Sequence, residues 1–536
     1  MVLFQATKPY KPAPPISYHE MLFSNKHRTP AEQPIYIDAA TKRTVTYGEL
    51  QTLIRQYGAG LYKQDMQVGD VIAVCAPNSV DYAVLFHSIL ASGGIMAALD
   101  RASDEKAIYD DLETVDARFV VAHPSTLDKV LRAATRFGIP KERIWLLGEP
   151  SLDSDFQSVN QALLDHDDIL KEFPTFTPDE LDVTPAMLYF TSGSTGRKKA
   201  VNLSHRVVCT SITQRDWWMP GTRNISFTEF HHGSALMITF SLAVYSGIPT
   251  YIMTEFDFKT FCRLVEEHAI TFVALQPWIA AKLAKDPIVD QHDLSSLNFV
   301  LSAGAALDPA IMKAVYQRLG IKILNMWGMT EALGVMLCSP DESAQGYAGK
   351  LAPGFEAKLV SQEGQELDVG DTGELWVRGP TVTPGYYRNP EATAKAIDSD
   401  GFLHTGDIFK VTNDGYFVFM DREKDLIKYH LYHIKPSEIE TVLIKLPEVA
   451  DCAVIGVYNS DQATELPRAY VMLANGCEYK EGMEKEIQDH VDSQLADKYH
   501  LRGGVVIMKD LPRTTTGKTN RPALREIARN EAVVAV

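Results

Sequence analysis

YFTSGSTGRKK, residues 189–199, is the most informative segment of this chain. An apolar stretch ends at Thr191 and opens into hydroxyl residues among two glycines, with three cationic residues behind them. Glycine allows backbone N–H groups to turn toward one point and hydroxyl groups add further donors, so such a loop suits a chain of phosphates. The alternative is an ordinary Ser/Gly surface turn, and the loop alone does not decide between the two.

This segment departs from two common catalytic signatures. A Walker A loop has a second glycine five residues after its first, but Lys198 stands at that distance from Gly193. The G-x-S-x-G elbow of serine hydrolases fails as well, because Ser192 occupies the place of its first glycine. The segment therefore predicts neither of these two enzyme classes.

Length and composition indicate a globular protein with more than one domain. The chain has 536 residues, of which 45% are apolar and 23% charged, and this excludes disorder, collagen and a simple coiled coil for the whole chain. A formal net charge of −17 argues against an overall nucleic-acid or anionic-membrane surface. The six cysteines form no C-x-x-C pair and the N-terminus lacks a signal-peptide profile, so we expect a cytoplasmic location.

Apolar strand patterns alternate with helical patterns over much of the chain, from about residue 46 to about 337. Such alternation predicts α/β layers around a parallel sheet. Two uncharged runs, Tyr82–Leu99 and Ser234–Met253, reach the length of a membrane span. Because glycines interrupt both, we expect each to form a buried helix, a turn and a buried strand, with no membrane span.

The predicted secondary structure changes twice after these α/β layers. Short β-rich stretches separated by Gly and Pro predict a small barrel-like subdomain at about 345–422. Helix, two strands, helix, strand and helix then follow in the pattern of a compact α+β unit. We therefore predict an N-terminal domain over 1–422 and a mobile C-terminal domain over 423–536, with the charged stretch 421–425 as the hinge.

Eight segments resemble, in sequence and in order, the motifs of the adenylate-forming superfamily. This superfamily includes acyl- and aryl-CoA ligases such as 4-coumarate–CoA ligase, adenylation domains of peptide synthetases, and beetle luciferases. The resemblance runs from about residue 45 to about 525, nearly the whole chain. The segments are Thr191–Lys199, Phe230–Gly233, Ser302–Leu307, Trp327–Glu331, Gly373–Gly379, His404–Asp407, Asp421–Lys428 and Thr516–Lys518.

The resemblance implies an AMP-forming acid–thiol ligase that acts in two halves. A carboxylate attacks the α-phosphate of ATP, which releases pyrophosphate and forms an acyl-adenylate. The thiol of coenzyme A or of a carrier protein then displaces AMP. The first half depends on charge neutralisation and in-line positioning more than on a protein nucleophile. ATP, Mg²⁺ and CoA are the implied cofactors, and a small carboxylic acid is the implied substrate.

The resemblance also assigns the nucleotide-binding positions. The β- and γ-phosphates are expected at Thr191, Ser192, Gly193, Ser194, Thr195, Gly196 and Lys199. The adenine is expected along Ala303, Gly304, Ala305, Trp327 and Gly328. Asp407 is expected to accept hydrogen bonds from the ribose hydroxyls, and Arg422 to donate to them.

The same resemblance assigns the catalytic residues and the pivot of the hinge. Lys518 is expected to bridge the attacking carboxylate and the α-phosphate, as a mobile point charge can. Thr330 is expected at the α-phosphate and Glu331 at Mg²⁺, a hard ion that prefers oxygen ligands. His232 is expected to position the substrate carboxylate. Lys428 is a further expected catalytic residue, and Lys424 is the expected pivot of the hinge.

Each of these residues, taken singly, has a plain alternative. Asp407 follows a glycine and suits a turn, while Glu331 suits the start of a helix. Arg422, Lys428 and Lys518 suit exposed loops. A lone histidine such as His232 is more often a satisfied core residue. Their occurrence together and in order favours the functional interpretation.

Three positions depart from the family's pattern. The usual T-G-x-P-K-G reads TGRKKA at 195–200, which keeps the lysine but loses the proline and the final glycine. Trp327 replaces a tyrosine and keeps an aromatic face. Leu431 replaces the glycine of K-Y-K-G-Y, which in CoA ligases lines the pantetheine tunnel. A leucine restricts the backbone and its close approach, so we expect Leu431 to weaken or alter the use of CoA.

The sequence therefore predicts ATP-dependent activation of an aryl or acyl acid, with CoA as the first acceptor. The alternatives are transfer to a small amine or to a carrier-protein thiol. A catalytically silent nucleotide-binding protein is a third hypothesis, against which the retained charges of Glu331, Asp407 and Lys518 argue. A luciferase-like oxygenase rests on the shared fold alone, and nothing in the sequence identifies the acid.

Overall fold

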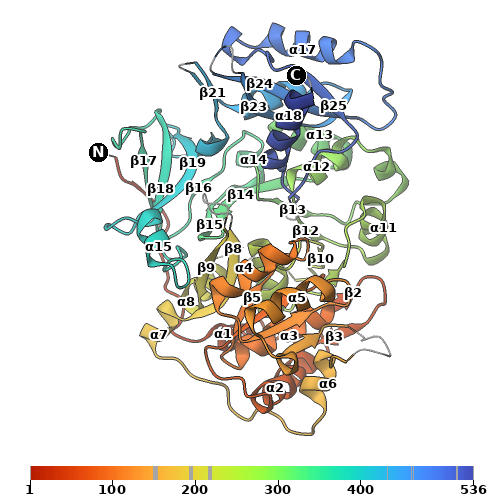
Figure 1. Ribbon diagram of the computed structural model, residues 1–536, viewed down its shortest axis with the longest axis vertical. Coiled ribbons are helices and arrows are strands. Elements are labelled where there is room, and N and C mark those ends of the chain that lie inside the picture. The colour runs from red at the N-terminus through yellow and green to blue at the C-terminus, as the bar shows by residue number, and fades with distance from the viewer. Residues whose placement is uncertain are drawn as a thin grey trace.

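The computed structural model describes residues 2–148, 155–191, 197–214, 220–430, 432–459, 462, 464–514 and 517–534. The predicted site residues at 192–196, and Leu431, lie outside these ranges. The chain forms α/β layers, a β-rich part and a smaller C-terminal α+β part (Figure 1). This arrangement confirms the predicted fold class.

A six-stranded sheet carries the segment at 189–199. Its order is β7-β6-β4-β5-β8-β9, and its neighbours are parallel except for the antiparallel pair β8 and β9. Every residue of β4 is buried, as expected of a parallel strand covered on both faces. The strands are β4 (Val71–Cys75), β5 (Ile95–Ala98), β6 (Phe119–Ala122), β7 (Ile144–Leu146), β8 (Pro185–Thr191) and β9 (Lys199–Ser204).

Helices cover both faces of this sheet. Two of them, α4 and α5, pack on one face, and several others pack in the core on the opposite face. The helices of this part are α1 (Tyr18–Leu22), α2 (Tyr47–Lys63), α3 (Val80–Ala91), α4 (Glu105–Val115), α5 (Leu127–Phe137), α6 (Val159–Leu164), α7 (Pro178–Val183) and α8 (His205–Thr213).

A nine-stranded sheet forms the second layer, in the order β16-β15-β14-β13-β12-β10-β11-β2-β3. Its central strands are parallel, and β3, β15 and β16 pair antiparallel at its two ends. The strands are β2 (Pro34–Asp38), β3 (Thr44–Thr46), β10 (Asn224–Ser226), β11 (Thr250–Ile252), β12 (Phe272–Leu275), β13 (Phe299–Ser302), β14 (Ile323–Met329), β15 (Ala332–Leu337) and β16 (Lys350–Leu351). The helices are α9 (Gly233–Ala235), α10 (Ala243–Ser246), α11 (Phe258–His268), α12 (Pro277–Lys285), α13 (Pro309–Leu319) and α14 (Pro340–Ser343).

The two uncharged runs fold as predicted, into helix, turn and strand. The first consists of α3, a turn with Gly93 at φ +76°, and β5. The second adds a feature that the sequence did not predict, a π-helical segment at Leu236–Leu242 between α9 and α10. Among the helices of the described ranges, none combines the length and the apolar character that crossing a membrane requires.

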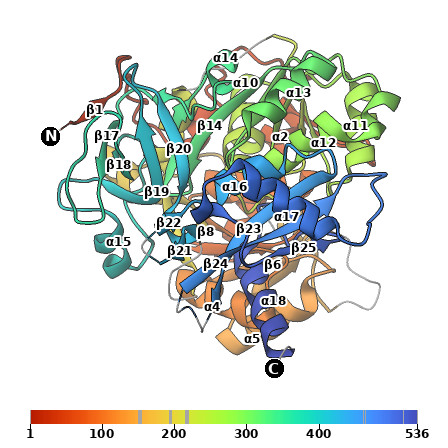
Figure 2. The same ribbon diagram turned by 90° about the horizontal axis from the view of Figure 1, so that it is seen from above.

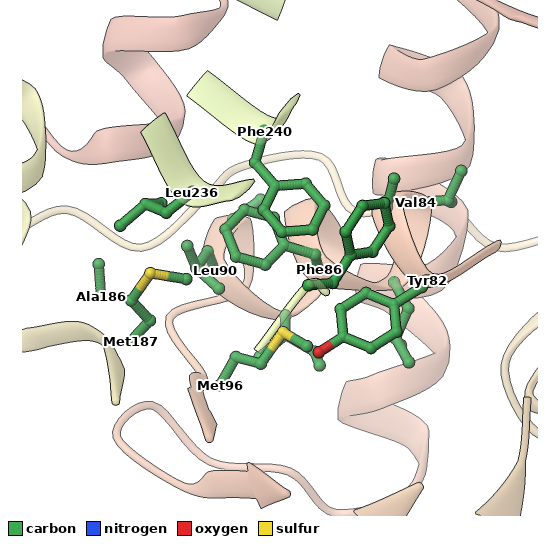
Figure 3. Close-up of a cluster of buried hydrophobic side chains, with 14 of the residues drawn as sticks. Tyr82, Val84, Phe86, Leu90, Met96, Ala186, Met187, Leu236 and Phe240 are labelled. Atoms are coloured by element: carbon green, nitrogen blue, oxygen red, sulfur yellow. The ribbon is translucent and has the colours of Figure 1, made fainter. Parts of the chain in front are cut away.

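One hydrophobic core joins the two sheets, and aromatic rings fill its centre (Figure 3). Phe240 of the π-helical segment stacks on Phe86 of α3 with 4.0 Å between ring centroids. Phe230 meets Phe240 edge-on at 4.7 Å, and Tyr82 packs beside both rings. This rigid core lies directly behind Phe230-His-His-Gly233, so it fixes the segment that carries His232.

The β-rich part is a five-stranded antiparallel sheet in the order β1-β17-β18-β19-β20. Its edge strand β1 pairs Phe4 with Ala357, a long-range contact that the local sequence pattern did not predict. The elements are β1 (Phe4–Gln5), β17 (Glu356–Val360), β18 (Thr372–Arg378), α15 (Pro390–Ala396), β19 (Leu403–Val411) and β20 (Phe417–Arg422).

The C-terminal part follows β20 through a 3₁₀ turn at Glu423–Asp425 and lies against α12 (Figures 1 and 2). The predicted order of helix, two strands, helix, strand and helix is observed, preceded by a short hairpin. The elements are β21 (Ile427–Tyr429), β22 (Tyr432–Ile434), α16 (Pro436–Leu443), β23 (Val449–Asn459), β24 (Thr464–Leu473), α17 (Met483–Gln494), β25 (Val505–Met508) and α18 (Arg521–Val534). The division at residue 422 into separately moving domains stays a prediction.

Candidate active site

The predicted motifs come from separate elements whose ends lie close together. β8 ends at Thr191, β13 ends at Ser302, and the β14–β15 hairpin turns at Thr330 and Glu331. Ligands in open α/β sheets bind outside the carboxyl ends of the strands, and β8 and β13 end at such an edge. Gly328 allows the hairpin to form, because a Cβ there would lie 2.5 Å from the backbone nitrogen of Gly334.

Glu331 is the centre of a buried polar cluster. Its side chain is 6% exposed, and its Oε1 accepts hydrogen bonds from the hydroxyls of Thr191 at 3.1 Å and Tyr386 at 3.0 Å. Lys199 pairs in register with Thr191, and its Nζ lies 4.0 Å from the centre of the Tyr386 ring. Burial lowers the pKa of Lys199, and the charge of Glu331 opposes this shift. A carboxylate, two hydroxyls and a cation are thus held together at the end of β8.

The three cationic residues of the segment have different partners. Lys198 donates to Asp111 at 2.8 Å and to Ser103 at 3.0 Å, and Arg197 pairs with Glu113. These two side chains therefore hold the residues before β9 against α4, whereas the Lys199 ammonium lies over the Tyr386 ring, where the charge of Glu331 acts on it. Asp111 is buried, and its desolvation raises its pKa to about 6, although Lys198 opposes the shift.

Asp407 and Arg422 form the second part of the candidate site. They are paired in register on β19 and β20, and Arg422 Nε lies 3.4 Å from Asp407 Oδ1. The indole N–H of Trp327 donates to the other carboxylate oxygen at 2.9 Å. Burial raises the pKa of Asp407, and Arg422 opposes that shift most strongly. The indole hydrogen bond gives Trp327 a role that sequence reasoning missed, that of fixing the Asp407 carboxylate.

Lys518 reaches this site from the C-terminal part. Two hydrogen bonds close its loop. The backbone N–H of Thr514 donates to the Lys518 carbonyl oxygen at 2.7 Å, and the backbone N–H of Lys518 donates to the Thr514 hydroxyl at 3.1 Å. A Cβ added at Gly304 would lie 3.3 Å from Lys518 Cε, so the lysine stem runs directly over that glycine. Burial lowers the pKa of Lys518 to about 8, and Arg422 adds to the shift while Asp407 opposes it.

His232 faces the same region from the start of α9. Its Nδ1 accepts from the backbone N–H of Ser234 at 3.3 Å and lies 3.0 Å from the Ser234 hydroxyl. Desolvation, together with the charge of Lys518, lowers the pKa of His232 to about 3. The imidazole is therefore neutral near pH 7, and its ring lies close enough to Lys518 to be affected by the ammonium group.

The remaining predicted residues differ in how closely they approach this site. Gly304 lies under the Lys518 stem, with Ala303 and Ala305 on either side of it in the chain. Gly328 belongs to β14, and Thr330 precedes Glu331 in the hairpin turn. Lys424 is exposed, yet its charge contributes to the pKa shifts of Asp407 and Lys518. Lys428 is exposed on β21, and its backbone bonds to Glu465 and Thr464, so it lies apart from the cluster in this arrangement.

Tyr386 is the clearest residue that sequence reasoning missed. Tyr386 contacts Glu331, which lies 55 positions earlier in the sequence, and Lys199, which lies 187 positions earlier. The only local signal is the turn-like Pro384-Gly-Tyr-Tyr-Arg388, whose Gly385 adopts φ +144°. No periodicity in that segment indicates which tyrosine points inward.

The comparisons with known proteins agree with this geometry. The model of the AMP-binding enzyme family matches residues 22–387, and that of the AMP-binding enzyme C-terminal domain matches residues 438–518. Luciferin 4-monooxygenase of Photinus pyralis is 32% identical and is aligned over 92% of this chain and 90% of its own. Probable 4-coumarate–CoA ligase 3 of Dictyostelium discoideum is 31% identical, over 97% and 95% of the two chains.

A solved structure extends the match to the whole fold. ATP-bound MatB from Rhodopseudomonas palustris superposes with a TM-score of 0.83 at 26% identity, covering 95% of this chain and 98% of its own. The family predicted from the eight motifs is thereby confirmed. This chain belongs to the AMP-binding enzyme family, with both its main domain and its C-terminal domain.

Proposed function

We propose that this protein is an AMP-forming ligase that activates a carboxylic acid with ATP and passes the acyl group to the thiol of CoA. The observation that carries the proposal is the convergence on Lys518. Its ammonium group, from the C-terminal part, interacts electrostatically with Glu331, Asp407 and His232, which come from three other segments. A cation held among these groups, above Gly304, suits a carboxylate attacking the α-phosphate.

In the first half, an oxygen of the acid bonds to the α-phosphorus while the bond to the bridging oxygen breaks and pyrophosphate leaves. Lys518 offsets the negative charge shared by the two reacting anions, which would otherwise repel each other. Neutral His232 orients the acid through its imidazole without adding charge. Asp407 accepts from the ribose hydroxyls, while Trp327 and Arg422 hold its carboxylate in place.

The residues around Glu331 suit Mg²⁺. This ion is commonly bound by one or two carboxylates together with substrate phosphates, and Glu331 is a buried carboxylate beside two hydroxyls. When bound, the ion neutralises charge on the phosphate oxygens. Thr191 and Tyr386 orient the carboxylate, and Lys199 adds a positive charge on the phosphate side.

In the second half, the sulfur of CoA bonds to the acyl carbon and AMP leaves. Lys518 has no role in this second half. We propose that the C-terminal domain turns about Lys424 and that this rotation brings β21, which carries Lys428, to the active site. A small amine is an alternative acceptor, and one observation favours it, the leucine at position 431 in place of glycine. A carrier-protein thiol remains the other alternative.

Replacing Lys424 with proline tests the pivot. Proline fixes φ near −65°, a value that suits the 3₁₀ turn at Glu423–Asp425 but restricts its rotation. We expect adenylate formation to persist and transfer from a presynthesised adenylate to fall about tenfold or more, because one arrangement is trapped. Lys424→Ala is the control, since it removes the charge and leaves φ free. Normal turnover by Lys424→Pro places the pivot elsewhere.

A product screen tests the proposed function itself. The protein is incubated with ATP, Mg²⁺ and panels of aryl and fatty acids, each with CoA, with small amines, or with neither. Mass spectrometry then distinguishes a CoA thioester from an amide and from a released adenylate. An adenylate without any thioester would support the amine or carrier alternative, and acid-independent ATP consumption alone would contradict the ligase assignment.

A further inference from the structure

The helix α12 contacts the C-terminal part at both of its ends. Near its start, Trp278 lies beside the loop that carries Lys518, because a Cβ added at Gly517 would be 3.1 Å from its indole nitrogen. Arg513, from the same loop, lies 5.7 Å from the Trp278 ring centre. The far end of α12 is Lys285, about two turns away from Trp278 along the same helix.

Lys285 joins the two domains through hydrogen bonds from a single ammonium group. Its Nζ donates to the backbone oxygens of Ile444 at 2.9 Å and Val449 at 2.8 Å. Ile444 is the C-cap of α16, directly after its last residue Leu443, and the backbone carbonyls at such a helix end lack helical partners while the helix dipole is negative there. Val449 is the first residue of β23, so Lys285 holds a helix end and a strand start together.

Further contacts join the two parts of the chain beside Lys285. The Lys285 residue is exposed overall, although its ammonium group is partly covered where it bonds to Val449, and this partial burial lowers its pKa. The Ile444 side chain packs on the hydrophobic core formed by α12 and its neighbours in the N-terminal part. Beside it, the Asn475 amide donates to Asp286 at 3.0 Å. An ammonium group with two carbonyl partners, an apolar contact and a further hydrogen bond therefore meet at this point.

The groups that Lys285 binds and the loop of Lys518 belong to one structural unit. Arg521, which begins α18, binds Glu440 of α16 at 2.7 Å, and the Glu440 carboxylate accepts from the backbone of Val454 in β23. A rotation at 423–425 that withdraws Lys518 from Gly304 therefore also carries Ile444 and Val449 away from α12. The contacts of Lys285 described above therefore accompany the arrangement that holds Lys518 over Gly304, and such a rotation would break them.

We propose that Lys285 is a positioning residue for adenylate formation. It acts through Lys518, by holding the C-terminal domain in the arrangement in which that lysine reaches the nucleotide site. The proposal rests on the proposed function, because it assumes that the two half-reactions use different arrangements. It gives Lys285 a role in the first half-reaction and none in the second.

The test compares Lys285→Met with a matched variant on the same helix, Lys282→Met. Lys282 contacts Asp286 at 3.7 Å and the Phe258 ring, both in the N-terminal part. For Lys285→Met we expect acid-dependent ATP–pyrophosphate exchange to fall about tenfold, the scale of losing hydrogen bonds from a charged donor. Transfer from a presynthesised adenylate should stay within about twofold of wild type, and Lys285→Arg should restore most of the exchange.

Small-angle X-ray scattering of the same proteins, without substrates, gives a readout that needs no activity. We expect Lys285→Met to show a larger radius of gyration than wild type, Lys282→Met and Lys285→Arg. Unchanged scattering with unchanged exchange overturns the proposal, and so does an equal loss of both half-reactions, which indicates a purely structural role. If wild type exchanges pyrophosphate with no acid, the proposed function fails, while the scattering difference still decides the role of Lys285.

Discussion

Replacing Lys518 with alanine should lower the rate of adenylate formation by on the order of 10²–10³, the usual effect of removing a charge that stabilises a transition state. The reason is local. Two anions, the acid and the α-phosphate, must approach each other, and the Lys518 ammonium is held over Gly304 among the groups expected to bind them. Transfer from a presynthesised adenylate should be nearly unaffected. Acid-dependent pyrophosphate exchange and single-turnover transfer measure the two halves separately.

Lys509→Ala is the matched control, because Lys509 is an exposed lysine of the same domain. It should change neither half-reaction. An equal loss in both halves of Lys518→Ala would contradict the two-arrangement mechanism, since Lys518 would then be needed throughout. Full activity of Lys518→Ala would remove the observation on which the proposed function depends.

The pH dependence of adenylation gives a second check on Lys518. Burial lowers its pKa to about 8, with Arg422 adding to the shift. The protonated ammonium is the form that neutralises charge, so kcat/KM for ATP should be highest below about pH 8 and fall as the pH rises through that value. In Lys518→Arg this basic limb should move to higher pH or disappear, because a guanidinium does not lose its proton in this range.

Local sequence patterns predicted most of the elements that place the site. The strands at Phe119–Ala122 and Phe299–Ser302 fall within the predicted alternation of strands and helices, and Val505–Met508 is the third strand of the predicted α+β unit, because each is a short apolar run. The end of β8 at Thr191 was also predicted, since the apolar run stops where hydroxyl and glycine residues begin. The π-helical segment at Leu236–Leu242 was not predicted, because an extra residue in one helical turn leaves no clear periodicity in a mostly apolar, uncharged run.

Local sequence patterns did not predict the side-chain contacts inside the candidate active site. The segment at 197–199 offers three cations in a row, and the sequence alone does not show that two of them pair with acids of α4, 84 and 87 positions earlier. The same holds for the hydroxyl of Tyr386 on Glu331 and the indole of Trp327 on Asp407. These pairings arise from the way the sheets stack, so only tertiary structure reveals them.

Glu331→Gln should lower the rate of adenylate formation by about 10²-fold and raise the Mg²⁺ concentration needed for half-maximal rate, because it removes the carboxylate charge that we propose binds the metal. The substitution is nearly isosteric. An amide oxygen can still accept from the hydroxyls of Thr191 and Tyr386, so the buried cluster should keep its hydrogen bonds and the unfolding temperature should change little. The rate is measured against free Mg²⁺ at saturating ATP and acid.

Tyr386→Phe separates the charge of Glu331 from its orientation. This variant leaves the carboxylate in place and removes one of its two hydroxyl donors, while the ring under Lys199 is kept. We expect a loss of about tenfold or less, the scale of one hydrogen bond to a charged group, with a smaller change in the Mg²⁺ requirement. A Mg²⁺ dependence of Glu331→Gln equal to that of wild type would show that the carboxylate serves the hydroxyl cluster alone. The metal would then be held by the phosphates and by groups other than Glu331.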